Sequence, residues 1–201
     1  MYRKLHYFSG LTIAVFTGFH LLNHILALKS IQLHIDFMSG LRMVYRNPLI
    51  ETALFIAVII QIISGLRMWR SLRNPKTGFF EKLHIATGLY LALFLTIHVL
   101  AVLSGRIFQG LDTNIYYGIA GLNTFPFLLF FVPYYFLAIT SFFGHIACVH
   151  RIRMRYRFLS LTPEQQSFAI IFLGISLAIV IFYGLTNGFQ GSYLPQEYRL
   201  K

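Results

Sequence analysis

Histidine is the residue type in this sequence that could bind a metal or a redox group. The 201 residues contain eight histidines but only one cysteine, Cys148. A single cysteine excludes an internal disulfide and any metal cluster that is held by several thiolates. We therefore expect any bound metal or redox group to be held through imidazole nitrogens.

The sequence contains an internal repeat with an offset of 78 residues. The segment KLHYFSGL at residues 4–11 matches KLHIATGL at residues 82–89. A proline at the start of the next apolar segment is also repeated, as Pro48 and Pro126. The repeat predicts two duplicated helix pairs followed by a fifth helix.

Each copy of the repeat carries two histidines, which are 14 residues apart. In a helix this spacing is a rise of about 21 Å and returns to within about 40° of the same face. Two duplicated helices that run in the same direction would place His20 and His98 at one depth, and His6 and His84 at another. Two imidazoles that face each other at equal depth suit bis-imidazole ligation of a haem iron. The spacing therefore predicts a haem with His20 and His98 as axial ligands.

The remaining histidines leave several alternatives open. His6 and His84 are either the ligands of a second haem or contacts to a haem propionate or a quinone. His24, one turn after His20, is an alternative axial ligand. The purely structural alternative is that all of these histidines only form hydrogen bonds to neighbouring helices.

Three more histidines lie outside the repeat. We expect His34 to be solvated in the first loop on the outer side of the membrane. His145 and His150 are expected at the end of the fourth helix, where a cationic side chain suits the helix dipole. His145 is also a candidate for lining a site on the inner side.

The composition is that of an integral membrane protein, because 57% of the residues are hydrophobic and only 11% are charged. Five apolar segments are each about long enough to cross a hydrocarbon core of roughly 30 Å. They cover residues 5–28, 47–69, 83–105, 124–150 and 162–183. We expect an all-α, five-helix bundle that forms one domain over residues 1–201.

The charge distribution predicts the orientation and the environment. Eleven of the seventeen basic residues lie on the side of the N-terminus, together with only two of the six acidic residues. The positive-inside rule then places the N-terminus inside. We therefore attribute the net charge of +11 to the orientation in the membrane and to contact with anionic lipids. The alternative is a docking surface for a soluble partner. We do not expect a nucleic-acid site. We expect a multi-pass protein of the bacterial plasma membrane or the mitochondrial inner membrane.

Several motifs of the chain are found together in one known family of membrane proteins. These motifs are RKLH at 3–6 with Gly10, FHLLN at 19–23, TG at 87–88, IHV at 97–99, and NPLIE at 47–51 with Gln61 and Gly65. Through them the chain resembles the single-chain, five-helix cytochrome b membrane-anchor subunit of succinate dehydrogenases and fumarate reductases. The resemblance implies a five-helix bundle with haem b that exchanges electrons with a membrane quinone. It also implies iron–sulfur and flavoprotein partner subunits on the inner side.

The sequence departs from this family at the second haem. The family's di-haem members take that haem's ligands from histidines one turn before a glycine in the second and fourth helices. Here the corresponding positions, before Gly65 and Gly144, are Gln61 and Thr140. The resemblance therefore implies one haem, whereas the histidine spacing admits two. We expect one.

The predicted function is that of a haem b anchor subunit of a quinone-linked oxidoreductase, which relays electrons between its partner subunits and quinone. The sequence shows no nucleophile–base set, phosphate loop or carboxylate pair, so substrate chemistry would belong to the partners. The alternatives are a stand-alone membrane b-type cytochrome and a haem-free transport or scaffold protein of the same fold.

A quinone site at the inner interface needs hydrogen-bond donors beside an apolar slot. The residues that meet this requirement at the inner ends of the first and third helices are Ser9, Thr87, His6, His84, Arg3 and Lys82. The alternative is that the Ser9 and Thr87 hydroxyls only bond backbone carbonyls of their own helices.

Overall fold

The computed structural model describes residues 1–71 and 78–200, and it is built from helices. Five helices are long and apolar enough to cross a membrane. They are α1 (Tyr2–Leu26), α3 (Pro48–Arg70), α4 (Phe79–Ile107), α6 (Leu128–Arg153) and α7 (Pro163–Leu185). No strand occurs within these two ranges. The all-α class and the multi-pass membrane character are therefore confirmed.

Local sequence signals explain where the spans begin. The Asn47 side chain accepts a hydrogen bond of 3.0 Å from the backbone N–H of Leu49 at the start of α3. Thr162 and Gln165 form a reciprocal capping box at the start of α7. At α4 the Glu81 carboxylate accepts from the Gly78 N–H at 3.1 Å. Helix α4 therefore begins at Phe79, one turn before the apolar run from residue 83 that predicted the helix.

The segments between the spans also fold. Helix α2 (Ile31–Tyr45) follows α1, and the short helix α5 (Ile115–Ile119) follows α4. The Ser30 hydroxyl caps α2 by accepting from the backbone N–H of Leu33 at 3.0 Å. The expectation of a solvated loop was wrong here, because His34 lies on α2 with only 2% of its surface exposed.

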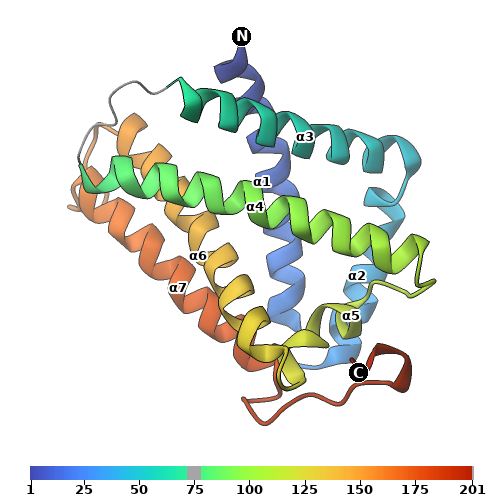
Figure 1. The fold of residues 1–201 in the computed structure, drawn as a ribbon. Coiled ribbons are helices and arrows are strands. Elements are labelled where there is room, and N and C mark those ends of the chain that lie inside the picture. The colour runs from blue at the N-terminus through green and yellow to red at the C-terminus, as the bar shows by residue number, and fades with distance from the viewer. Residues whose placement is uncertain (72–77, 201) are drawn as a thin grey trace.

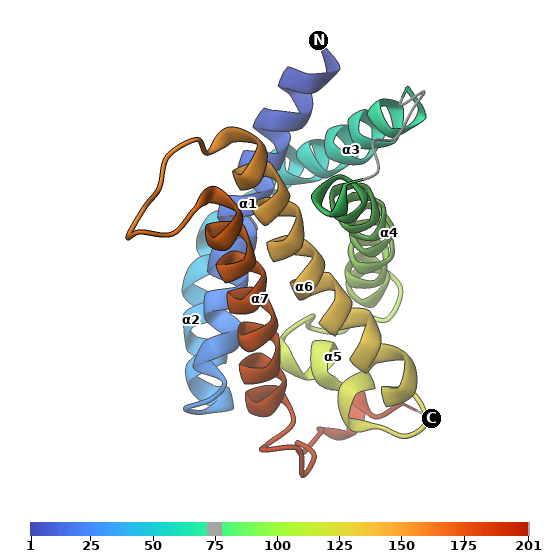
Figure 2. The ribbon, with the colours of Figure 1, turned by 90° about the vertical axis from the view of Figure 1, so that its left-hand side faces the viewer.

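The long helices pack in pairs. Helix α1 packs against α3, α4 against α6, and α6 against α7, whereas α1 and α4 are not a closely packed pair within the described ranges. Figures 1 and 2 show α3 and α4 crossing the bundle beside α1 and α6. The repeat in the sequence relates the pair α1–α3 to the pair α4–α6.

The ends of the spans separate onto two sides. In Figure 1 the N-terminus lies at the top and the α6–α7 connection at the left, whereas α2, α5 and the C-terminus lie towards the bottom right. These sides are called the N-terminal side and the C-terminal side below. Which of them faces the cell interior stays a prediction. Two of the basic residues that it counts, Arg73 and Lys76, lie outside the described residues.

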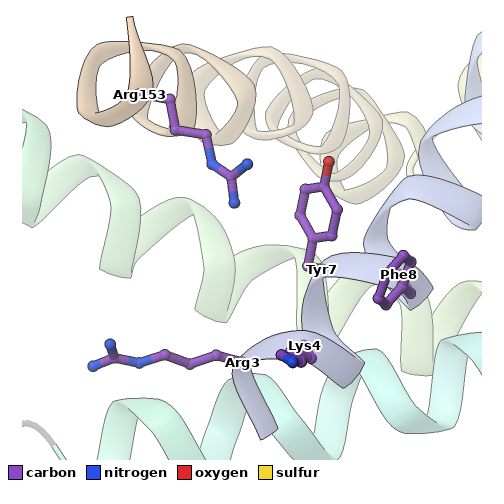
Figure 3. Close-up of a pocket in the computed structure, with 5 residues that line it drawn as sticks. All are labelled: Arg3, Lys4, Tyr7, Phe8 and Arg153. Atoms are coloured by element: carbon purple, nitrogen blue, oxygen red, sulfur yellow. The ribbon is translucent and has the colours of Figure 1, made fainter. Parts of the chain in front are cut away.

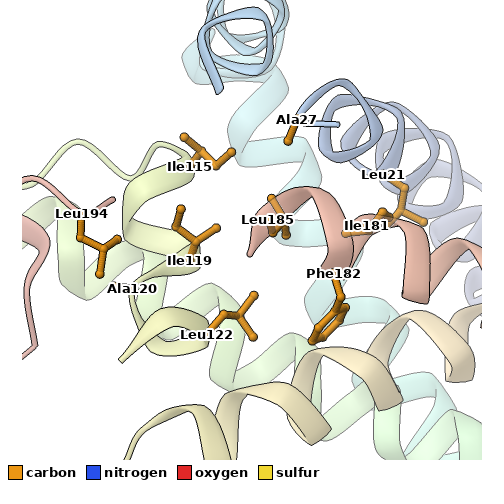
Figure 4. Packing of buried hydrophobic residues seen from close by; sticks show 10 residues of the cluster. All are labelled: Leu21, Ala27, Ile115, Ile119, Ala120, Leu122, Ile181, Phe182, Leu185 and Leu194. Carbon is orange, nitrogen blue, oxygen red and sulfur yellow. The ribbon is translucent and has the colours of Figure 1, made fainter. Parts of the chain in front are cut away.

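An apolar cluster closes the C-terminal side of the bundle (Figure 4). It joins the ends of α1 and α7 to α5 and to the tail of the chain. Its members are Leu21, Ala27, Ile115, Ile119, Ala120, Leu122, Ile181, Phe182, Leu185 and Leu194. The connecting segments thus cover the ends of the spans from which the histidines described below project.

An ion pair joins α3 to α4 on the same side. The Arg106 guanidinium, near the end of α4, donates to the Glu51 carboxylate in the first turn of α3, and the two side chains are 30% and 22% exposed. Because both groups are largely shielded from water, removing one charge leaves the other poorly solvated.

We expect Glu51→Gln to lower the free energy of unfolding by about 1–2 kcal/mol, between the values for exposed and buried ion pairs. The measurement is thermal unfolding of the detergent-purified protein. The control is Glu164→Gln, because Glu164 pairs with Arg151 at 3.9 Å and the two side chains are 57% and 42% exposed. Equal destabilisation by the two variants would contradict a structural role for the Glu51 pair.

Candidate functional site

Four histidines gather towards the C-terminal side of the bundle, and we call them the His20 cluster. His20 and His24 come from α1, His34 from α2 and His98 from α4. The ring centroids of His20 and His98 are 6.3 Å apart. The Nε2 atoms of His20 and His24 are 3.2 Å apart, and His24 Nδ1 is 3.3 Å from His34 Nε2. Residues from three helices thus form one continuous set of imidazoles.

A phenylalanine orients each of the two predicted haem ligands. The ring of Phe16 stacks on His20 with centroids 5.9 Å apart and an interplanar angle of 13°. The ring of Phe94 stacks on His98 at 5.1 Å and 14°. Each phenylalanine lies one turn before its histidine, and the two occupy equivalent positions in the repeat. The repeat therefore reproduces a ring geometry as well as a residue type.

The spacing of His20 and His98 fits two axial ligands of one iron. A metal–imidazole nitrogen bond is about 2.0 Å, and a ring centre lies about 1.1 Å behind its nitrogen, so two opposed ligands have centres about 6.2 Å apart. The observed separation is 6.3 Å. The two rings lie at an interplanar angle of 65°, on helices that are not closely packed, and His20 Nε2 contacts His24.

His24 is held between two other imidazoles. Its Nε2 contacts His20 and its Nδ1 contacts His34. No stacked phenylalanine supports its ring within the described part of the chain. The structure therefore places His24 beside the candidate ligands, as a neighbour of His20.

His34 is buried, and the Asn23 amide donates to its Nε2 at 3.1 Å. Its Nδ1 has no hydrogen-bond partner among the described residues. Burial, together with the nearby His20 and Arg42, lowers the pKa of His34 to about 4. His34 is therefore neutral at pH 7. Sequence patterns did not indicate this burial, because it depends on how α2 folds back over α1.

The lowered pKa predicts a loss of stability in acid. The contribution of neutral His34 is complete above the ordinary pKa of 6.5 and is lost as the pH falls from there through about 4. We expect His34→Gln, which keeps a polar side chain, to remove up to about 3 kcal/mol of this pH dependence. The measurement is the melting temperature of both proteins from pH 7.5 to 4. Parallel curves for the two proteins would contradict the prediction.

A second polar group lies nearer the N-terminal side, between α1 and α3, and we call it the His6 cluster. His6 Nδ1 lies 3.0 Å from the Ser64 hydroxyl, and His6 Nε2 lies 3.1 Å from the Gln61 amide nitrogen. The Ser9 hydroxyl donates to Gln61 Oε1 at 2.7 Å. Both nitrogens of His6 are thus used within one helix pair.

His84 contacts its own helix pair, α4 and α6, through a ring contact with another histidine. Its ring centroid is 4.4 Å from that of His145 on α6. Thr87 Oγ1 is 3.4 Å from His145 Nδ1. Among the described side chains, no aromatic contact joins His84 to His6. The structure therefore brings together the pair at His20 and His98, but it places His6 and His84 in separate contacts.

The residues of the predicted quinone site have other partners. Ser9 donates to the Leu5 carbonyl at 2.8 Å in addition to its contact with Gln61, and Thr87 donates to the Leu83 carbonyl at 2.7 Å. These are the local bonds that the alternative interpretation expects. Arg3 and Lys82 are exposed on the N-terminal side. The quinone site stays a prediction.

Sequence reasoning missed the role of two amides. Gln61 bridges His6 and Ser9, and its position is the one where the resembled family places a second haem ligand. Asn23 is buried against His34. The polar type of both residues within apolar runs was the available signal.

No protein-family model, no curated protein and no solved structure matches this chain. Within the described ranges, no group of three or more histidine, cysteine, aspartate or glutamate side chains is arranged to hold a bare metal ion. A haem iron needs only two ligands from the protein, because the porphyrin supplies the other four. The His20–His98 pair meets that smaller requirement.

Proposed function

We propose that this protein is a membrane b-type cytochrome that passes electrons between a partner and a membrane quinone. The observation that carries the proposal is the His20–His98 pair, with ring centres 6.3 Å apart on two duplicated segments. The matching Phe16 and Phe94 stacks support it, because each holds its histidine ring nearly parallel to the phenylalanine ring one turn before it.

The chain's own residues would hold the group and shape its surroundings. His20 and His98 would hold the iron through imidazole nitrogens, while Phe16 and Phe94 would limit the rotation of these rings. The apolar cluster on the C-terminal side covers the ends of the spans and restricts the access of water. Bound haem supplies a one-electron redox centre, which no side chain here provides.

We propose one haem for each chain. His6 is hydrogen-bonded to Ser64 and Gln61, and the ring of His84 makes an edge-on contact with His145, so each of these histidines has a partner within its own helix pair. Thr140 stands at the second position where the family has a haem-ligand histidine and this chain does not. Its hydroxyl donates to the Phe136 carbonyl at 2.9 Å. These contacts favour a structural role for the polar groups on the N-terminal side.

The resemblance to the succinate dehydrogenase and fumarate reductase anchors supports the finer parts of the proposal. These are two duplicated helix pairs, an N-terminus inside, and iron–sulfur and flavoprotein subunits bound on that side. Helix α1 packs closely on α3, and α4 packs closely on α6, and this likeness between the two pairs supports the duplication. A haem-containing chain that purifies from its native membrane without a flavoprotein would instead favour the stand-alone cytochrome.

One observation favours the haem-free alternative. His20, His24 and His34 contact one another in a hydrogen-bonded chain, which satisfies several of their nitrogens without a cofactor. In a scaffold or transport protein, these contacts would serve only to join α1 to α2. The optical spectrum separates this alternative from the cytochrome.

The purified protein is expected to show a Soret band, and an α-band that appears on reduction with dithionite. His20→Ala and His98→Ala should each abolish the low-spin bis-histidine signal, because each removes one axial ligand. His150→Gln is the control, since His150 lies at the end of α6 and contacts Gln166 at 2.9 Å. A protein without these bands, or single variants that retain bis-histidine haem, would overturn the assignment.

The haem content is expected to be one per chain, measured as pyridine haemochrome against protein. His84→Ala should leave the ratio at one, because His84 contacts His145 and not a second iron. A ratio near two that falls to one in His84→Ala would show that His6 and His84 bind a second haem.

A further inference from the structure

The face of α1 that points away from the histidines carries two cavities. The first has a volume of about 360 Å³ and lies on the N-terminal side, where α1 meets the end of α6 (Figure 3). Its lining residues are Arg3, Lys4, Tyr7, Phe8 and Arg153. The second has a volume of about 300 Å³ and lies further along α1. Its lining residues are Ala14, Val15, Gly18, Phe19 and Leu22.

The two cavities share one stripe of the helix surface. At 100° per residue, Lys4, Leu11 and Gly18 fall within about 40° of one another, whereas His20 falls on the opposite side. Leu11 is 52% exposed and lies between the cavities. The second cavity begins at Ala14, about 15 Å along the helix from Lys4, which is half the thickness of a hydrocarbon core. One elongated molecule entering from the N-terminal side could therefore occupy both cavities.

The first cavity has the chemistry of an anion site. Three of its lining residues are cationic, and none of its lining residues is acidic. Within the described ranges, Arg3, Lys4 and Arg153 form no salt bridge. The Arg153 guanidinium lies 4.7 Å above the ring of Tyr7, which directs it towards the start of α1 (Figure 3). The fold thus brings cations from the start of α1 and the end of α6 together beside the aromatic side chains of Tyr7 and Phe8.

The second cavity has the chemistry of an apolar groove. Its lining residues are uncharged, and Val15 and Phe19 are more than half exposed. A Cβ atom built on Gly18 would meet nothing within 4 Å, so the absence of a side chain there leaves the groove open. An acyl chain matches this surface, because it has no polar group to satisfy in the hydrocarbon core.

We propose that this face of α1 binds one anionic phospholipid. The phosphate lies among Arg3, Lys4 and Arg153, and an acyl chain runs over Leu11 into the groove at Gly18. The charge selects this occupant, because a quinone head group is neutral and leaves three cations unpaired. The proposal does not depend on haem, since the histidines lie on the opposite face of α1.

The head-group contact is tested with the detergent-purified full chain by native mass spectrometry, titrated with phosphatidylglycerol and phosphatidylcholine. One saturable phosphatidylglycerol site is expected, with phosphatidylcholine at least tenfold weaker. A cation near a membrane surface contributes about fivefold in binding, so the triple variant Arg3→Gln, Lys4→Gln, Arg153→Gln should lose about a hundredfold. Arg155→Gln with Arg157→Gln is the control, because both residues are exposed near the same end but outside the cavity. This pair should change affinity less than twofold.

The acyl-chain contact is tested with Gly18→Leu, which adds a side chain to the groove at a position where a Cβ atom meets nothing within 4 Å. It should weaken long-chain phosphatidylglycerol at least fivefold and leave the dioctanoyl form unchanged, because the shorter chain ends before the groove. Gly40→Leu on α2 is the matched control, since a Cβ atom there also meets nothing within 4 Å. Equal effects of Gly18→Leu on the two lipids would overturn the placement of the acyl chain.

Three further outcomes would overturn the proposal. Equal affinity for phosphatidylcholine would show a site that ignores charge. Inorganic phosphate binding as tightly as phosphatidylglycerol would show a free-anion site without a lipid. Competitive displacement of phosphatidylglycerol by decylubiquinone would show that the cavities belong to quinone. The haem content of every variant should equal that of the parent, so a failure of the lipid proposal is distinguishable from a failure of the proposed cytochrome.

Discussion

The structure depends on one constraint, which is that a polar group inside a bilayer must find its partner within the protein. The spans α1, α3, α4 and α6 carry histidine, serine, threonine and glutamine side chains among otherwise apolar residues. Their contacts follow the helix packing, with His6 joining α1 to α3 and His84 joining α4 to α6. These polar contacts specify helix partners that apolar side chains, surrounded by equally apolar lipid, would specify poorly.

The same constraint divides α1 into two faces with different surroundings. His6, Ser9 and His20 point into the bundle, where other helices supply their contacts. The opposite face, which includes Leu11 and Val15, is exposed along most of the span. A single helix therefore lines the candidate redox site with one face and meets the lipid with the other.

The connecting segments determine the surroundings of the His20 cluster. Helix α2 folds back so that His34 is buried against Asn23 and His24. Helix α5 and the C-terminal tail complete the apolar cluster at the same end. Helix α2, which is outside the spans, thus covers the His24 end of the cluster, and a site for a redox group needs such shielding from water as much as it needs its ligands.

The sequence by itself determined the five spans and the starts of α3 and α7, because apolar length and the capping residues Asn47 and Thr162 act locally. It also predicted that His20 and His98 lie at one depth, because a repeated segment repeats its position in the membrane. Only the tertiary structure decided the burial of His34, the contact of Gln61 with His6, and the meeting of Arg153 with the start of α1. Each of these depends on how the helices cross and tilt against one another, and packing sets those angles rather than the pattern of any one segment.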